Sequence, residues 1–306
     1  MTQEISAVSS ALEGRIIRGI GGFYYVETAN GLYECKARGI FRKKGQAPLP
    51  GDMVSISVQS DGKEKEGSIE AIATRKNFLI RPAVANLDQL FIVSSVCHPD
   101  LNLFMIDKVI AVAENKGITP ILLITKTDLK RPEGIADIYR KAGIDCFELS
   151  PEKTSSLSVI RGMLSNRLSA FTGNSGVGKS TLLNLLYPEL KLQTGDISQK
   201  LGRGRHTTRE VTLFPVEDGG YIADTPGFSS LDLERYEVVK KEDLPFCFRE
   251  FGNYLDSCSF TSCSHTCEKG CAVLKAVAEG KIAPSRHANY VAMYNEVKNI
   301  KEWEKK

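Results

Sequence analysis

Residues 173–181 of this chain read Gly173-Asn174-Ser175-Gly176-Val177-Gly178-Lys179-Ser180-Thr181. The pattern is G-x-x-x-x-G-K-S, and it follows the apolar, strand-like run Leu168–Thr172 and opens a helix. Its glycines let successive backbone N–H groups turn inward around phosphates, and the helix N-terminus adds its dipole. We therefore predict a nucleotide-phosphate site in which Lys179 reaches the β- and γ-phosphates and Ser180 holds Mg²⁺.

A second phosphate motif, D-x-x-G, stands downstream at Asp224-Thr225-Pro226-Gly227, at the end of a short apolar strand. Asp224 is expected to act on Mg²⁺ through water, and the Gly227 amide to sense the γ-phosphate. Between the two motifs, Gly202–Arg209 is a flexible basic stretch with hydroxyl groups. It suits a switch loop in which Thr207 or Thr208 closes on Mg²⁺, although a plain surface loop is the competing interpretation.

The choice of base is indicated by Thr125-Lys126-Thr127-Asp128, which ends the apolar run Pro120–Ile124. The Asp128 carboxylate can accept two hydrogen bonds from the guanine N1–H and exocyclic amine, a donor pair that adenine lacks. Lys126 would lay its alkyl stem along the ring. The sequence therefore favours GTP over ATP, and it disfavours an ATP-dependent kinase or a DNA-binding zinc protein.

Three positions depart from the usual GTPase pattern. Thr125 replaces an Asn, so its hydroxyl must take over part of the bridging role of that amide. Ser150 is the further candidate for the base pocket, but Pro151 after it lacks an N–H that could bind the base oxygen. Phe228 follows Gly227 where Ras-like proteins carry a water-orienting Gln, so we expect slow hydrolysis in isolation.

The catalytic set expected from these motifs is therefore small. The attacking water would be positioned by His206 or by a group from a partner, and Arg203, Arg205 or Arg209 would stabilise transition-state charge. The residues we expect to act in catalysis are His206, Lys179, Thr207 and Thr208.

The regions before and after these motifs have different patterns of strand-like and helical sequence. Short strand-like runs at Gly14–Glu27, Leu32–Arg38, Asp52–Val58 and Gly67–Ala73 predict a small N-terminal β-barrel of the oligonucleotide-binding (OB) size. After Pro82, apolar runs alternate with helical stretches such as Leu101–Lys116, which predicts a mostly parallel α/β sheet. The strands are expected at Gln89–Val96, Pro120–Thr125, Asp145–Leu149 and Leu168–Thr172.

The end of the chain lacks strand signals and carries a dense Cys/His cluster. Cys258-x4-Cys263-x-His265-x5-Cys271 offers three thiolates and one imidazole, which is the donor set of a closed structural zinc site. Spacing alone leaves Cys267 and Cys271 as alternatives for the fourth ligand. A final helix from about Ser285 is expected to pack through a stripe of apolar residues, namely Tyr290, Tyr294, Val297, Ile300 and Trp303.

Composition excludes several classes of protein. The 306 residues are 42% hydrophobic and 25% charged, as in ordinary globular proteins, and the net charge is only +3. No apolar run reaches the roughly 18 residues of a membrane helix, and the first eleven residues do not form a signal peptide. We expect a cytoplasmic protein without membrane contact. Local basic clusters, such as Arg38, Arg42, Lys43 and Lys44, matter more for RNA than the total charge.

The order of the motifs is unusual, because the base-reading motif precedes the phosphate loop. Together with the stretch 202–209, the N-terminal barrel and the C-terminal Cys/His cluster, this permuted order resembles the bacterial ribosome small-subunit-dependent GTPase family (RsgA, YjeQ or YloQ). The resemblance covers roughly Leu12–Trp303. It implies an OB barrel in 1–75, a circularly permuted Ras-like GTPase domain in 76–232, and a helical zinc domain in 233–306, with Cys271 as the fourth ligand.

The resemblance also implies a function. Such a protein hydrolyses GTP to GDP and phosphate, binds the 30S subunit and its rRNA late in maturation, and contains one structural Zn²⁺ besides the Mg²⁺ that accompanies GTP; we expect a monomer. The alternative is an RNA-binding assembly factor that uses GTP only as a structural clamp. Because the permutation places residues 224–227 beside the zinc domain, we also expect the nucleotide to set the orientation of that domain.

Overall fold

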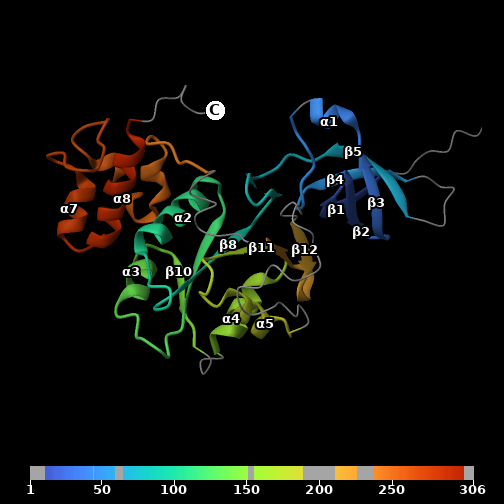
Figure 1. Ribbon diagram of the computed structural model, residues 1–306. Helices are drawn as coiled ribbons and strands as arrows, with labels where there is room; N and C mark the ends of the chain where they lie inside the picture. Colours follow the sequence, from blue (N-terminus) through green and yellow to red (C-terminus); the bar gives the residue numbers. More distant parts are fainter. Residues whose placement is uncertain are drawn as a thin grey trace, which may run out of the picture.

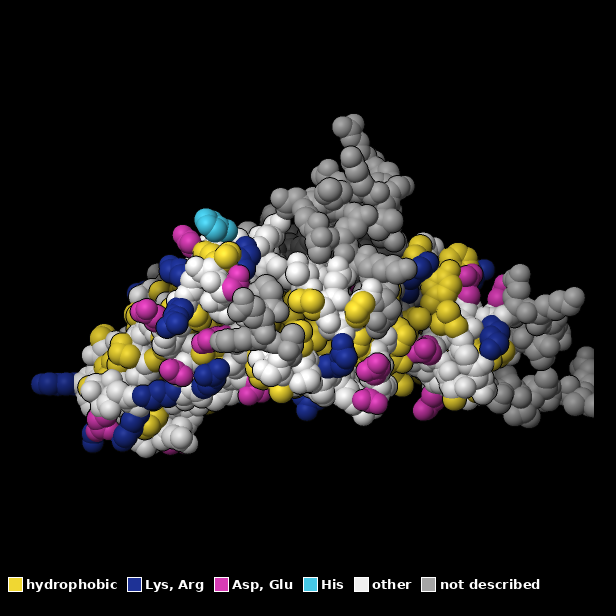
Figure 2. Space-filling model, turned by 90° about the horizontal axis from the view of Figure 1, so that it is seen from below, with side chains coloured by type: hydrophobic (Ala, Val, Ile, Leu, Met, Phe, Trp, Pro, Cys, Tyr) yellow, Lys and Arg dark blue, Asp and Glu magenta, His cyan; other side chains and the backbone are white. Residues whose placement is uncertain are grey.

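The computed structural model describes residues 11–43, 45–58, 65–150, 155–188, 211–225 and 237–299. Figure 1 shows three parts in a row: a barrel of strands, a central domain in which helices surround a sheet, and a C-terminal group of short helices. The space-filling view in Figure 2 shows basic and acidic side chains interspersed over the described surface of one face. None of the helices in the described part combines the length and apolar character needed to span a bilayer.

The N-terminal strands close into the expected barrel. Their order is β1-β2-β3-β5-β4, with β4 also paired to β1, so that within this unit the sheet has no open edge. Inward-facing apolar residues such as Ile16, Val26 and Ile56 fill it, because side chains alternate between the two faces of each strand. The elements are β1 (Leu12–Ile20), β2 (Phe23–Thr28), β3 (Gly31–Ala37), α1 (Gly39–Lys43), β4 (Met53–Val58) and β5 (Glu66–Ile72).

One expectation about the barrel is wrong. The run Gly14–Glu27 is two strands of a hairpin, and Ile20 pairs with Phe23 across the turn. Gly21 and Gly22 both have positive φ, at 59° and 90°. Two consecutive residues with positive φ make the tight turn that matches the twist of a hairpin, and glycine adopts this conformation most readily.

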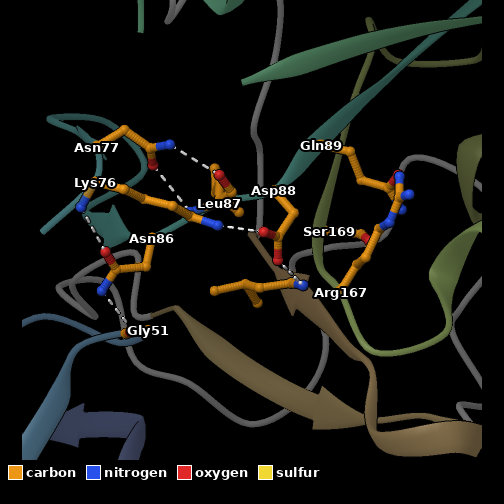
Figure 3. Close-up of polar contacts among 10 residues, drawn as sticks. Gly51, Lys76, Asn77, Asn86, Leu87, Asp88, Gln89, Arg167 and Ser169 are labelled. Atoms are coloured by element: carbon orange, nitrogen blue, oxygen red, sulfur yellow. Dashed lines mark hydrogen bonds and ion pairs between the residues drawn. The ribbon is translucent and has the colours of Figure 1, made fainter. Parts of the chain in front are cut away.

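The linker after the barrel is fixed by side-chain amides (Figure 3). It contains β6 (Phe78–Leu79) and β7 (Val84–Ala85), which pair with each other. Asn77 exchanges two hydrogen bonds with Leu87, and Asn86 Nδ2 donates to Gly51 O of the barrel at 3.0 Å. Asp88 then accepts the Leu168 N–H at 2.7 Å. The linker therefore contacts both the barrel and the central sheet.

The central domain is a parallel sheet with helices on both faces, as expected. Its strands run in the order β10-β9-β8-β11-β13, and antiparallel β12 connects this sheet to β1 through Arg18 and Thr212. Each of the four expected strands is found within one residue of its predicted ends. The elements are β8 (Gln89–Ser95), α2 (Leu103–Asn115), β9 (Thr119–Thr125), α3 (Ile135–Lys141), β10 (Asp145–Glu148), α4 (Ser155–Leu164), β11 (Leu168–Thr172), α5 (Lys179–Leu186), β12 (Thr212–Pro215), the 3₁₀ turn η2 (Glu217–Gly219) and β13 (Tyr221–Asp224).

The C-terminal part is helical and packs against α2. Tyr290 is fully buried and makes edge contacts with Phe248 and Phe251, at centroid distances of 5.2 and 4.9 Å. The packing role expected for Tyr290 is thus confirmed, whereas Ile300 and Trp303 lie outside the described residues. The elements are the 3₁₀ turns η3 (Leu244–Cys247), η4 (Arg249–Phe251) and η5 (Leu255–Ser257), then α7 (Ala272–Ala278) and α8 (Pro284–Val297).

Candidate active site and metal centre

The phosphate-loop sequence forms a tight connection between β11 and α5. Gly176 and Gly178 have φ values of 79° and 91°, in the left-handed region that glycine tolerates best. At Gly173, an added Cβ would lie 2.4 Å from the carbonyl oxygen of Val93. All three glycines of the motif are therefore required by the backbone itself.

Lys179, the first residue of α5, and Asp224, the last residue of β13, interact electrostatically. β11 and β13 are parallel, with Ala170 opposite Ala223, so their carboxyl ends meet at one edge of the sheet. Burial lowers the pKa of Lys179, and the negative charge of Asp224 partly reverses this effect. A further anion beside the ammonium group would stabilise its charged form in the same way.

The remaining residues of the phosphate motif differ in exposure. Val177 is buried and its N–H donates to Asn174 O at 3.5 Å, while Ser180 lies half-buried in the first turn of α5. The exposed members are Asn174, Ser175, Gly176 and Thr181.

Thr125 connects the base-reading motif to the phosphate loop. Its hydroxyl donates to Val177 O at 2.6 Å and also lies 3.2 Å from Ser94 O. That this hydroxyl takes over part of the bridging role of the usual Asn amide stays a prediction. This hydrogen bond joins two motifs whose bonded residues are 52 positions apart in the chain.

The rest of the base-reading motif is held by backbone carbonyls. Lys126 has φ 59°, and its ammonium donates to Cys97 O at 3.3 Å and to His98 O. Thr127 donates to Leu149 O through both its hydroxyl and its N–H, at 3.1 and 3.3 Å, which brings it beside half-buried Ser150. Asp128 is exposed at the same edge of the sheet.

The sequence did not predict that Cys97 and His98 contact Lys126. Both accept its hydrogen bonds through backbone carbonyls, which every residue type has. Their position directly after β8 was the available signal, because ligands in parallel sheets bind beyond the carboxyl ends of the strands.

The expected switch residues cannot be placed. Gly202–Arg209, which contains His206, Thr207 and Thr208, lies outside the described residues, and so do Gly227 and Phe228. Their roles stay predictions.

A metal-binding geometry is present in the C-terminal domain. The donor atoms of Cys258, Cys263, His265 and Cys271 all lie within 4.8 Å of one another. His265 Nδ1 is 3.5 Å from Cys258 Sγ and 3.6 Å from Cys271 Sγ, and these two sulfurs are 3.9 Å apart. Ligands around a tetrahedral zinc ion lie about 3.5–3.8 Å apart, so this set fits such an ion. Cys267 is exposed and outside the set.

The neighbourhood of the cluster supports thiolate ligands. The N–H groups of Ala272 and Leu274 point at Cys258 Sγ and Cys271 Sγ, at 3.3 and 3.5 Å. Burial raises the pKa of Cys263 to about 12, an effect that a coordinating dication would reverse. Burial alone would also raise the pKa of Glu268, but hydrogen bonds from Ser264 and nearby backbone N–H groups lower it to about 2. The loop of residues 264–268 is therefore held by hydrogen bonds to the negatively charged carboxylate of Glu268.

Comparison with known proteins agrees with this geometry. A model of the RsgA GTPase family matches residues 72–234, and one of the RsgA N-terminal domain matches residues 13–69. A protein of Caldanaerobacter subterraneus subsp. tengcongensis named small ribosomal subunit biogenesis GTPase RsgA is 44% identical over 290 residues, 94% of this chain and 96% of its own length. The chain belongs to the RsgA GTPase family. It is therefore a GTPase.

Other members of the RsgA family extend the comparison. The protein of the same name from Streptococcus pneumoniae serotype 4 is 45% identical over 96% of this chain and 98% of its own length. The crystal structure of YloQ, described as a circularly permuted GTPase, is similar with TM-score 0.78 and 34% identity, covering 98% of this chain and 99% of its own. YjeQ from Thermotoga maritima gives TM-score 0.80 and 31% identity, covering 95% and 100%.

Proposed function

We propose that this GTPase binds the small ribosomal subunit and its rRNA, hydrolyses GTP there, and is released as the late maturation of the subunit proceeds. For the nucleotide, the supporting observation is the 2.6 Å hydrogen bond between Thr125 and Val177, which connects a base-reading motif to a phosphate loop. For the partner, the support is the name of relatives that match nearly the whole chain, small ribosomal subunit biogenesis GTPase RsgA.

The proposed nucleotide site follows the edge of the sheet. Asp128 accepts the guanine N1–H and amine, Lys126 covers the ring, and Ser150 completes the base pocket. The phosphates lie over the loop between β11 and α5, beside the ammonium of Lys179. Ser180 and Asp224 would hold Mg²⁺, which, when bound, neutralises charge that develops on the phosphates. The full proposed set is Thr125, Lys126, Thr127, Asp128, Ser150, Gly173, Asn174, Ser175, Gly176, Val177, Gly178, Lys179, Ser180, Thr181, Asp224 and Gly227.

Hydrolysis is proposed to depend on the partner. Phe228 cannot orient water, so the nucleophile is positioned by His206 or by a group of the ribosome, with Thr207 or Thr208 closing on the metal. Such a site turns over slowly until the subunit completes it.

The C-terminal cluster is proposed to bind one structural zinc ion per chain. Cys258, Cys263, His265 and Cys271 leave no open coordination position once bound to a tetrahedral ion. The zinc would fix a domain in which short turns outnumber regular helices.

RNA binding is proposed for the barrel. Arg18 lies over Tyr25 with its guanidinium carbon 4.9 Å from the ring centroid, and Lys36 lies over Phe23 at 5.1 Å. Aromatic faces beside basic groups suit stacked bases and phosphates. Charges of both signs mix on the face in Figure 2, so such local pairs matter more than overall charge. We propose a cytoplasmic monomer without membrane contact.

The direct test is GTP turnover by the purified chain across separate titrations of small and large subunits. Small subunits should raise the turnover number strongly, and large subunits should not. Equal turnover with and without small subunits would contradict partner activation. GTP binding without any hydrolysis would instead favour the alternative, in which GTP is a structural clamp.

A further inference from the structure

The turn that follows β8 is closed by a buried serine. Ser95 is the last residue of β8, is 1% exposed, and pairs with Thr125 of β9 across the sheet. Its hydroxyl donates to Pro99 O at 2.8 Å, four residues further on. This hydrogen bond folds residues 95–99 back over the end of the strand.

The carbonyls of this turn point at Lys126. The ammonium donates to Cys97 O at 3.3 Å and to His98 O, both of which lie inside the turn that Ser95 closes. The Val96 N–H donates in the opposite direction, to Thr125 O at 3.2 Å. The turn is therefore connected to the base-reading motif at two points, the backbone of Thr125 and the side chain of Lys126.

The same turn lies beside the phosphate loop. A Cβ added at Gly176 would lie 3.9 Å from Pro99 Cδ and 4.0 Å from His98 O. Residues 95–99 thus border both halves of the nucleotide site, although nothing in the G-x-x-x-x-G-K-S or base-reading patterns includes them.

We infer that Ser95 is a positioning residue for the nucleotide: by holding the Cys97 and His98 carbonyls around the Lys126 ammonium, it keeps the Lys126 stem extended over the purine ring. The inference rests on the proposed role of Lys126. A tethered stem is already ordered before the base arrives, so binding loses less side-chain entropy. Because the stem contacts the ring and not its exocyclic amine, Ser95 acts on affinity for purine nucleotides and leaves the discrimination by Asp128 unchanged.

The test is the dissociation constant for GDP and IDP, measured with the full chain and Mg²⁺. Ser95→Ala should weaken both by the same factor, about three- to tenfold, as for the loss of one hydrogen bond. Lys126→Met keeps the apolar stem and removes the tether, so it should weaken both similarly. The double variant should bind no more weakly than Lys126→Met alone, because coupled residues are not additive.

The matched control is Ser169→Ala. Ser169 is also fully buried in the central sheet and also makes one side-chain hydrogen bond, with Gln89 Nε2 at 2.8 Å, but at the opposite end of the strands. Ser169→Ala should lose about as much thermal stability as Ser95→Ala and should keep the nucleotide affinity of the wild type. In a GTP titration with saturating small subunits, Ser95→Ala should raise KM and leave kcat unchanged.

Three results would overturn the inference. They are unchanged affinity in Lys126→Met, equal affinities of Ser95→Ala and Ser169→Ala, or additive losses in the double variant. Lys126→Met changes a side chain that is not in the core, so it tests the inference even if Ser95→Ala folds poorly. Failure of the wild-type chain to bind GDP would instead overturn the proposed guanine site, and this inference with it.

Discussion

The two ends of the central domain are joined to their neighbours by different chemistry. At the barrel side, the contacts are mainly backbone and amide hydrogen bonds: Ala85 N–H donates to Pro50 O at 2.9 Å, and Asn86 Nδ2 donates to Gly51 O at 3.0 Å (Figure 3). Backbone groups must be paired wherever they are buried, so such contacts fix geometry without bringing in charge.

At the C-terminal side, the contacts include a network of buried charges. Arg286 of α8, 1% exposed, donates to Asp107 of α2 at 2.6 Å and to Glu250 at 2.8 Å. Burial alone would lower the pKa of Arg286, but the two carboxylates raise it, so the guanidinium stays charged. Asn289 and Tyr139 complete the network by donating to Asp107 at 2.6 and 2.9 Å.

The two sides should therefore tolerate different substitutions. A polar contact between neutral groups loses about 1 kcal/mol when one partner is removed. A buried charge that loses its partner costs several kcal/mol, because the remaining charge cannot be solvated. The C-terminal side should therefore fail as a unit, whereas the barrel side should weaken by small steps.

The largest effect is expected from removing the metal. A chelator, or Cys263→Ala, should abolish the cooperative unfolding of residues 237–299, since structural zinc contributes about 10–16 kcal/mol in small zinc domains. Limited proteolysis and elemental analysis would measure it, with one zinc expected per chain. Cys267→Ala is the control and should keep the metal. A metal-free chain as resistant to protease as the metal-bound chain would contradict this.

The second largest effect is expected from removing the buried cation Arg286. Arg286→Met should lower the free energy of unfolding by about 3–5 kcal/mol, because Asp107 and Glu250 stay buried without a cation. Lys108→Met removes another ion pair between α2 and α8, with Glu296 at 2.7 Å, but there the glutamate is half exposed. It should cost at most about 1 kcal/mol. Equal losses in urea unfolding would refute the contrast.

The third effect is on the barrel side. Gly51 has φ 95°, and a Cβ there would lie 2.0 Å from Ala85 O. Gly51→Ala should cost about 1–3 kcal/mol, as for other strained backbone positions. At Gly39 an added Cβ meets no atom within 4 Å, so Gly39→Ala should change stability by about 0.5 kcal/mol or less. Urea unfolding that shows no difference between the two variants would exclude this close approach.

The smallest effect is a dependence on alkaline pH. Tyr221 at the start of β13 donates to Glu27 of the barrel at 2.5 Å, and burial, together with this contact, raises its pKa from 10 to about 12. The folded pKa lies above the unfolded one, so the contribution is fully present below pH 10 and is lost as the pH rises through 12. Since Tyr221 is partly exposed, we expect at most about 1 kcal/mol.

Thermal unfolding of the wild type and Tyr221→Phe at pH 8 and pH 11.5 measures this effect. The advantage of the wild type should shrink at the higher pH. An advantage that grows with pH would mean that the sign is wrong.

Features formed by residues close together in the chain could be predicted from the sequence, whereas contacts between distant residues could not. The strands beside residues 173–181 were predicted within one residue because the pattern and its apolar run are local. The Cys/His set was local too, but the choice of Cys271 over Cys267 came from the resemblance and needed coordinates to test it. Arg286 and Asp107 are 179 positions apart, and no periodicity connects them. The turn at Gly21 and Gly22 was missed because the apolar pattern continues across it.

Glu237 connects the linker to the end of α2. The chain re-enters the described structure at Glu237, whose buried carboxylate accepts the Ile80 N–H at 2.8 Å and pairs with Lys116 at 2.7 Å. Asp224 lies at the proposed phosphate site and Glu237 contacts both the linker and α2. We predict that a nucleotide-driven change at Asp224 reaches the flanking domains through contacts such as those of Glu237.

Coupling between the nucleotide and the flanking domains is measured by the affinity of small ribosomal subunits for the chain loaded with a non-hydrolysable GTP analogue or with GDP. If the nucleotide controls the arrangement of the flanking domains, the GTP form should bind more tightly, with a coupling free energy of about 1–3 kcal/mol, or roughly five- to 150-fold in affinity. By reciprocity, subunits should tighten the analogue relative to GDP by the same factor. Equal affinities in the two nucleotide states would contradict the account.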